Sequence, residues 1–193
     1  MRRIVVGFLL LTISACVAVP QGPQVAGGTR ITQLGISFAV PEGRSWTVLV
    51  QSTYQVMLGA RGNSPNETLI TAIGTYNVPA FDVPEGFLNF VKSGRANEPK
   101  TGTFEVIRND EQWYAERSET CVKHESAAKD FAAKRGGAFT MIEYYGMNCI
   151  HPGNPSVGIF VEFSRKGPSG VEFPQFRAMG ERLLKSVEFT SYK

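Results

Sequence analysis

Short stretches in which apolar and polar residues alternate recur along most of this chain, and they constrain its fold more than any other feature. Ile36, Phe38 and Val40 share one parity of the first stretch, which ends at a turn over residues 41–43. Because successive side chains of a β-strand point to opposite faces of a sheet, this period of two predicts half-buried strands. Further strands are predicted at residues 46–50, 54–58, 69–76, 103–108, 112–123 (after an Asn109-Asp110 turn), 139–150, 157–165 and 188–190.

Three segments have the spacing of an amphipathic helix instead. Asp82 and Pro84 suit the start of a helix that ends near Gly94, and an alanine-rich pattern over residues 126–135 predicts another. The strongest pattern places apolar residues three, four, seven, eight and eleven positions after the first, namely Phe176, Met179, Gly180, Leu183, Leu184 and Val187. The order of these elements predicts a single layered α+β domain over residues 34–193, with helices packed on a largely antiparallel β-sheet.

The first 15 residues have the composition of an export signal. Arg2 and Arg3 precede an apolar run over residues 4–13, and a short basic segment before a short apolar one is typical of such signals. The run is shorter than the ~20 residues that a permanent transmembrane helix needs. A buried helix of the folded domain is the alternative, but the run is apolar on all sides and follows charges at the start of the chain. We therefore predict a signal peptide at residues 1–15.

The run ends in Ile13, Ser14, Ala15 and Cys16, which resembles the lipobox of bacterial lipoproteins. The resemblance implies that the thiol of Cys16 receives lipid, that the signal is cut before Cys16, and that acyl chains hold the protein at the lipid bilayer of the cell envelope. Val17 stands where an aspartate favours retention in the inner membrane of enterobacteria, so the resemblance implies the outer membrane, facing the periplasm. Ordinary secretion, with cleavage at an A-x-A-like site, is the alternative.

Residues 16–33 are predicted to form the lipidated cysteine and a flexible tether. They are rich in Pro, Gly, Val and Gln and carry no hydrophobic period. A chain of about sixteen such residues spans on the order of 20 Å on average. The tether is therefore expected to hold the domain clear of the lipid headgroups.

The charge of the chain gives no indication of a nucleic-acid partner. Basic residues number 20 and acidic residues 17, and removal of Arg2 and Arg3 with the signal lowers the formal charge from +3 to +1. Nucleic-acid binding needs a clustered basic face. The basic residues near 129–135 and at 165–166 are interrupted or few, so we interpret them as solvated surface.

The cysteine count predicts one disulfide. Three cysteines are present, and if Cys16 carries lipid, Cys121 and Cys149 are left to pair. An oxidising compartment favours that pairing. The two residues are 28 positions apart, and closing such a loop stabilises a fold by about 3.6 kcal/mol in the chain-entropy description.

The two ends of the predicted domain resemble those of PsbP-like domains. The opening, residues 36–46, combines a first strand, a Pro-x-Gly turn and a tryptophan, and the ending runs from an amphipathic helix into residues 184–189. The resemblance implies a PsbP-like α+β fold and a non-catalytic role in binding or assembly. It supplies no catalytic residue, and the usual nucleophile-elbow, Walker and zinc-protease motifs are absent from the sequence.

The only two histidines lie close to the paired cysteines in sequence. His124 follows Cys121 by three residues and His151 follows Cys149 by two, so four ligands for zinc or copper are conceivable. A disulfide removes both thiolates, and on a regular strand Cys121 and His124 face opposite sides. We therefore predict no metal, no cofactor and no catalytic residue, and keep an envelope hydrolase or a metal-binding protein that uses His124 and His151 as the alternative.

A group of aromatic residues is a weaker indication of a ligand groove. Trp113, Tyr114, Tyr144 and Tyr145 lie on strands predicted to be neighbours, and tyrosine suits both a groove and a core. The sequence as a whole favours a membrane-tethered, non-catalytic binding or accessory module of the envelope, whose partner is an envelope protein or a small ligand.

Overall fold

The computed structural model describes residues 22–64, 66–96, 104–118, 120–131, 139–169 and 173–192. The predicted signal peptide and Cys16 lie outside these residues. The elements are β1 (Gln24–Ala26), β2 (Arg30–Gln33), β3 (Ile36–Ala39), β4 (Ser45–Gln51), β5 (Gln55–Arg61), β6 (Thr68–Asn77), α1 (Pro84–Ala96), β7 (Phe104–Trp113), β8 (Cys121–Asp130), β9 (Thr140–His151), β10 (Asn154–Pro168), α2 (Gln175–Ser186) and β11 (Glu188–Phe189).

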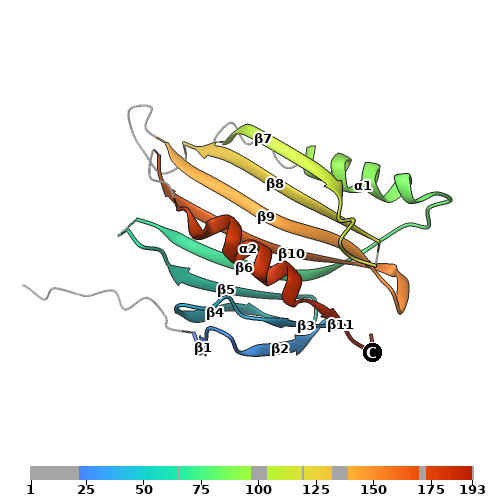
Figure 1. The fold of residues 1–193 in the computed structure, drawn as a ribbon, viewed down its shortest axis with the longest axis horizontal. Helices are drawn as coiled ribbons and strands as arrows, with labels where there is room; N and C mark the ends of the chain where they lie inside the picture. Colours follow the sequence, from blue (N-terminus) through green and yellow to red (C-terminus); the bar gives the residue numbers. More distant parts are fainter. Residues whose placement is uncertain are drawn as a thin grey trace, which may run out of the picture.

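Most of these strands form one antiparallel sheet of eight strands in the order β1-β4-β5-β6-β10-β9-β8-β7, and a second sheet has the order β11-β3-β2. Figure 1 shows α2 lying across the large sheet and α1 lying beside its β7 end. Two neighbouring residues of β8 pack on opposite faces of the large sheet. Cys121 belongs to the core under α2, and Val122 belongs to the core under α1. The two helices therefore cover opposite faces, and the predicted α+β class with a largely antiparallel sheet is confirmed.

The larger core lies between the sheet, α2 and the small sheet. Trp46, Phe163 and Phe176 are in ring contact across it, with centroids 6.3 Å and 5.1 Å apart. The indole Nε1 of Trp46 donates a hydrogen bond of 2.8 Å to the carbonyl oxygen of Pro41. The residues of the predicted Pro-x-Gly turn and its tryptophan are thus joined by a buried bond, which satisfies the indole without exposing it.

The smaller core lies under α1, where Phe87 and Val91 pack against Val78 and Val122.

Among the described residues, no helix is long and apolar enough to span a bilayer.

Part of the predicted tether belongs to the folded domain. Residues 24–26 form β1, which pairs with β4, and residues 30–33 form β2, which pairs with β3. Val25 and Ile31 are half-buried against the larger core, so one apolar residue is enough to hold each short edge strand. The prediction that the tether extends to residue 33 was therefore wrong.

Two further predictions in the middle of the chain were wrong. Residues 126–130, predicted as helix, continue β8, because Ala127 and Ala128 are buried within the sheet, where small residues pack between its layers. Asn109 and Asp110, predicted as a turn, lie inside β7 opposite Ser126 and Glu125. The seven residues Phe104–Asp110 of this outer strand are exposed, so polar turn-forming residues fit it.

Cys121 and Cys149 lie directly opposite each other on β8 and β9, and their sulfurs form a disulfide. Their Cα atoms are 4.1 Å apart, and both residues are buried in the larger core. The pairing is the one that the cysteine count predicts.

We expect that replacing both cysteines with alanine lowers the free energy of unfolding by about 2–5 kcal/mol, as for other native disulfides. Urea unfolding of the full chain with and without a thiol reductant measures this. The reductant should destabilise the wild-type chain and leave the double variant unchanged. Equal stability of the two proteins without reductant would contradict the prediction.

Candidate functional site

A cleft of about 370 Å³ lies between α1 and the large sheet. We call it the α1 cleft. Its lining residues come from α1 and from β6, β8, β9 and β10, and they are Tyr76, Phe90, Val91, Gly94, Arg95, His124, Asn148, Phe160 and Glu162. A second cavity of about 310 Å³ near residues 79–84 is lined mainly by apolar residues. We take the α1 cleft as the candidate site, because aromatic and charged side chains converge in it.

Glycines of neighbouring strands shape the floor of the α1 cleft. Three ring side chains each face a glycine directly across the sheet, in the pairs Tyr76 with Gly158, Phe160 with Gly74 and His124 with Gly146. A Cβ added at Gly158 or Gly74 would come within 2.4 Å of the opposing ring, and at Gly146 within 2.6 Å. The rings therefore lie over the glycine backbone, which only a residue without a side chain permits.

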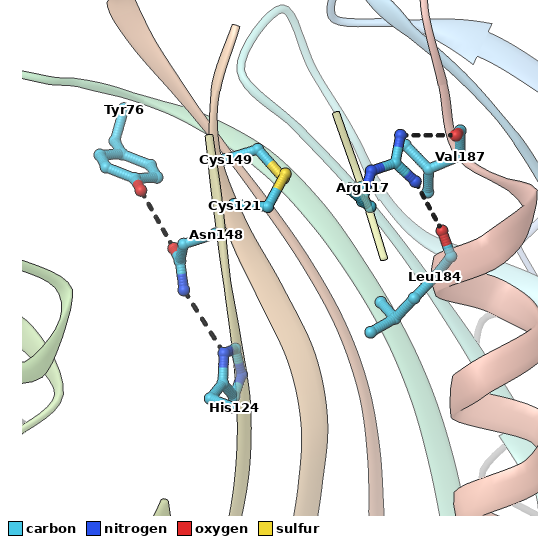
Figure 2. Close-up of a disulfide and its surroundings, with 8 residues drawn as sticks. All are labelled: Tyr76, Arg117, Cys121, His124, Asn148, Cys149, Leu184 and Val187. Atoms are coloured by element: carbon cyan, nitrogen blue, oxygen red, sulfur yellow. Dashed lines mark hydrogen bonds between the residues drawn. A yellow bond between two sulfur atoms is a disulfide. The ribbon is translucent and has the colours of Figure 1, made fainter. Parts of the chain in front are cut away.

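A chain of polar contacts orients the ring of His124. Figure 2 shows the hydroxyl of Tyr76 donating to Oδ1 of Asn148 (3.1 Å), and Nδ2 of Asn148 lying 3.4 Å from Nδ1 of His124. Burial raises the pKa of the Tyr76 hydroxyl, which therefore stays protonated and donates. The carbonyl of Asn148 is thereby engaged, so its amide faces the histidine and Nδ1 of His124 accepts. The remaining ring hydrogen of His124 is then on Nε2.

The Nε2 atom of His124 has no hydrogen-bond partner in the part of the chain that the structure describes. Oε2 of Glu162 lies 3.5 Å from it, which is long for a hydrogen bond. Only 2% of His124 is exposed. Burial lowers the pKa of His124, and although Glu162 acts in the opposite direction the net shift is downward. The ring is therefore neutral near pH 7 and keeps one buried N–H donor without a partner among the described residues.

Arg95 connects the last turn of α1 to three strands of the sheet. Its guanidinium lies 3.3 Å from Glu111 and 3.8 Å from Glu162, and it donates a hydrogen bond of 2.6 Å to Ser126. The side chains of Arg95 and Glu111 are 11% and 7% exposed. Among the described residues, two carboxylates face one guanidinium, so with a neutral His124 the groups of Arg95, Glu111 and Glu162 sum to a formal charge of −1. The contacts fix α1 over the sheet and so define the width of the cleft.

His151 lies on the other face of the sheet, with the disulfide. Its Nδ1 accepts a hydrogen bond of 3.0 Å from the N–H of Gly153, so Nε2 carries the hydrogen and donates to the carbonyl oxygen of Gly35 at 3.0 Å. The ring also contacts Phe189 and Tyr192. The two ring nitrogens are therefore used in the β9–β10 hairpin and in a bond to the turn between β2 and β3, while the ring packs on the carboxyl-terminal segment. His151 has a structural role.

The two histidines do not share a site, as the parity of β8 and β9 predicted. Figure 2 shows His124 and Asn148 on one side of these strands and the disulfide on the other. The described residues contain no cluster of three or more His, Cys, Asp or Glu side chains that could hold a metal ion. The structure therefore does not bring His124 and His151 together in one site.

The aromatic residues predicted to line a groove are also divided between the two faces. Tyr114 and Tyr145 are buried in the core under α2, where the ammonium of Lys123 lies 5.0 Å and 5.3 Å from their ring centroids. Trp113 packs against the core under α1. These residues do not form one groove.

Sequence reasoning missed the residues that make the α1 cleft, apart from His124. Tyr76, Asn148 and Glu162 lie on predicted strands but were assigned no role, and Arg95 follows the glycine at which the helix was predicted to end. One sequence signal was available. Isolated glycines inside the predicted strands, at positions 74, 146 and 158, are typical of places where another group approaches the backbone closely.

No family model matches the chain, and no curated protein matches it. The chain is similar in structure to the crystal structure of the Ran-binding protein Mog1p from Saccharomyces cerevisiae, with 12% sequence identity, a TM-score of 0.45, and coverage of 84% of this chain and 96% of that chain. A structure of a Mog1 mutant gives 13% identity, a TM-score of 0.46 and the same coverage.

The lowered pKa of His124 predicts a loss of stability on acidification. An unfolded histidine titrates near 6.5 and the folded His124 below it, so between these values the unfolded chain binds more protons. The free energy of unfolding should therefore fall as the pH drops from about 7.5 to about 5.5, by up to ~1.4 kcal/mol per pH unit. Urea unfolding at a series of pH values measures this slope.

The variant His124→Gln should remove that slope, whereas His151→Gln should lower stability but keep the contribution of His124. Parallel loss of stability in the wild-type chain and in His124→Gln would show that this histidine does not titrate as its burial requires. Glu67 and Glu181 do not interfere, because their pKa values are lowered from 4.5 and they titrate at lower pH.

Proposed function

We propose that this protein is a lipid-anchored lipoprotein of the bacterial envelope whose PsbP-like domain binds a small ligand in the α1 cleft without chemical turnover. The lipobox-like residues that end at Cys16 support the anchor. The unsatisfied Nε2–H of the buried His124 carries the binding role. Leaving a buried donor unpaired costs about 1–3 kcal/mol, and a ligand that accepts from it recovers that cost.

The geometry of the amino terminus supports close contact with the membrane. Gly22 lies six positions after Cys16 in the sequence, and the N–H of Val48 on β4 bonds to the carbonyl oxygen of Pro23 at 2.8 Å. An extended chain advances by ~3.5 Å per residue, so a segment of six residues can span at most about 20 Å. The edge formed by β1 and β4 is therefore the part of the domain next to the bilayer.

The residues of the α1 cleft suit binding better than catalysis. Among the described residues that line it, none is Ser, Thr, Cys or Lys, four of the side chains that can act as nucleophiles. Its polar groups are held by one another, through Tyr76 and Asn148 on the sheet and Arg95 on the helix. A site fixed in this way loses little conformational freedom when a ligand enters.

The variant Cys16→Ser tests the anchor. We expect the wild-type chain to fractionate with membranes and the variant to be found in the aqueous fraction, because two or three acyl chains give stable anchoring at ~0.8 kcal/mol per buried methylene. Metabolic labelling with a fatty acid should mark only the wild-type chain. Membrane association of an unlabelled Cys16→Ser chain would contradict the anchor.

The variant Gly94→Leu tests the cleft. Gly94 lines the cleft, and a Cβ added there would meet no heavy atom within 4 Å. Leucine should therefore fill the cleft without strain, and Ser93→Leu, at an exposed neighbouring position of the same helix, is the control. We expect native mass spectrometry to detect a small-molecule adduct on the wild-type and Ser93→Leu chains and at least tenfold less on Gly94→Leu. An adduct unaffected by Gly94→Leu, or turnover by the purified chain, would overturn the proposal.

A further inference from the structure

We propose that the ligand of the α1 cleft is a neutral saccharide, bound through a hydroxyl group between His124 and Glu162 and stacked on the aromatic floor. This inference rests on the proposed binding role and names the chemical class of the ligand. It follows from the hydrogen-bonding state of His124, from the shape of the floor and from the charge of the cluster.

The polar groups of the cleft are complementary to a ligand group that both accepts and donates a hydrogen bond. Nε2 of His124 is a donor, because Asn148 occupies Nδ1. Oε2 of Glu162, 3.5 Å away, is an acceptor. A hydroxyl oxygen accepts from the first and donates its hydrogen to the second. A ligand carboxylate could accept from His124 but would face Glu162, and an ammonium could donate to Glu162 but would leave the N–H of His124 unpaired.

The floor of the cleft suits a ring that has an apolar C–H face and polar edges. Phe160 and Tyr76 lie over Gly74 and Gly158. Phe90 of α1 stacks on Tyr76, with an interplanar angle of 16° and centroids 6.2 Å apart, so Phe160 is the floor ring outside that stack. The C–H groups on one face of a pyranose carry partial positive charge and pack well on the negative face of an aromatic ring. The hydroxyls at the edge of the same ring then reach the polar side of the cleft.

The charge and the volume of the cleft further limit which ligands can bind there. The −1 charge of the cluster formed by Arg95, Glu111 and Glu162 repels an anion, so sugar acids and phosphates fit poorly. The cleft volume of about 370 Å³ is at the small end of the ~300–1,000 Å³ of ligand pockets. We therefore expect one or two sugar rings.

The two histidines allow a direct test by NMR of the ¹⁵N-histidine-labelled full chain. The chain is kept in a polyoxyethylene detergent, since the headgroup of an alkyl glycoside detergent would compete. Glucose and galactose are titrated as neutral pyranoses, glucuronate as the anionic probe and choline as the cationic probe. We expect a pyranose to shift the ring nitrogens of His124 saturably, while His151, on the other face, does not respond.

The matched variants are Glu162→Gln and Glu188→Gln. Loss of the carboxylate charge at position 162 should weaken pyranose binding about tenfold, because hydrogen bonds to charged groups are stronger than neutral ones. Glu188 is on β11 with a side chain 69% exposed, so Glu188→Gln should bind as the wild-type chain does. Equal affinity of Glu162→Gln and the wild-type chain would overturn the inference.

The remaining outcomes separate the ligand class from the binding role. If choline or glucuronate shifts His124 and no pyranose does, the saccharide inference fails and the binding role of the cleft stands. If no probe shifts His124 and Gly94→Leu leaves the adducts of the purified chain unchanged, the cleft holds only solvent, and both the inference and the proposed function fail.

Discussion

The register of β8 on β9 is the constraint on which the rest of this structure depends. Cys121 faces Cys149 directly and the disulfide joins them in the larger core. Because side chains alternate along a strand, this one pairing sends the cysteines toward α2, and sends His124 and Asn148 toward α1. A slip of one residue would exchange the two faces and destroy both the core and the cleft. The disulfide therefore secures a site on the face that it does not touch.

Two buried polar clusters of the chain show how differently such groups can be used. Arg165 is almost fully buried and contacts Glu67 and Glu143, and Glu67 also accepts from the backbone N–H groups of Asn63 and Ser64. Burial alone would raise the pKa of Glu67, but these hydrogen bonds outweigh it and the net shift is downward. The cluster is satisfied by the protein itself and closes the loop before β6. In the α1 cleft, by contrast, Nε2 of His124 has no hydrogen-bond partner among the described residues. An unsatisfied buried donor is expected where a ligand completes a site.

The sequence predicted the elements well where local pattern decides them. The period of two located β3, β4, β6, β9 and β10, and the apolar stripe located α2, because each depends on residues close together in the chain. The failures have a common cause. Alanines at 127 and 128 favour a helix locally, yet β8 is completed by neighbours on both sides, and Val25 and Ile31 form strands only because β4 and β3 are there to pair with them.

The cleft could not be predicted from the sequence for the same reason. Tyr76 is opposite Gly158 and His124 is opposite Gly146 only after β6 has paired with β10 and β8 with β9. These partners are far apart in the chain, and a shift of register in either pair would replace a glycine by a larger neighbour. Parity did predict that Cys121 and His124 face opposite sides. It did not identify which groups would surround the histidine.

The order of strands also determines how the cleft would stand relative to a membrane. The edge that follows the proposed tether is formed by β1 and β4, and the cleft lies over β6, β10, β9 and β8 on the other half of the sheet. Neighbouring strands are ~4.8 Å apart, so β1 and β10, four strands along, are separated by about 19 Å. A short tether at Cys16 would thus keep the β1 edge at the headgroups and leave the cleft in the aqueous phase. A ligand that reaches it from there is a soluble one, which agrees with the proposed binding of a hydroxyl group by His124 and Glu162.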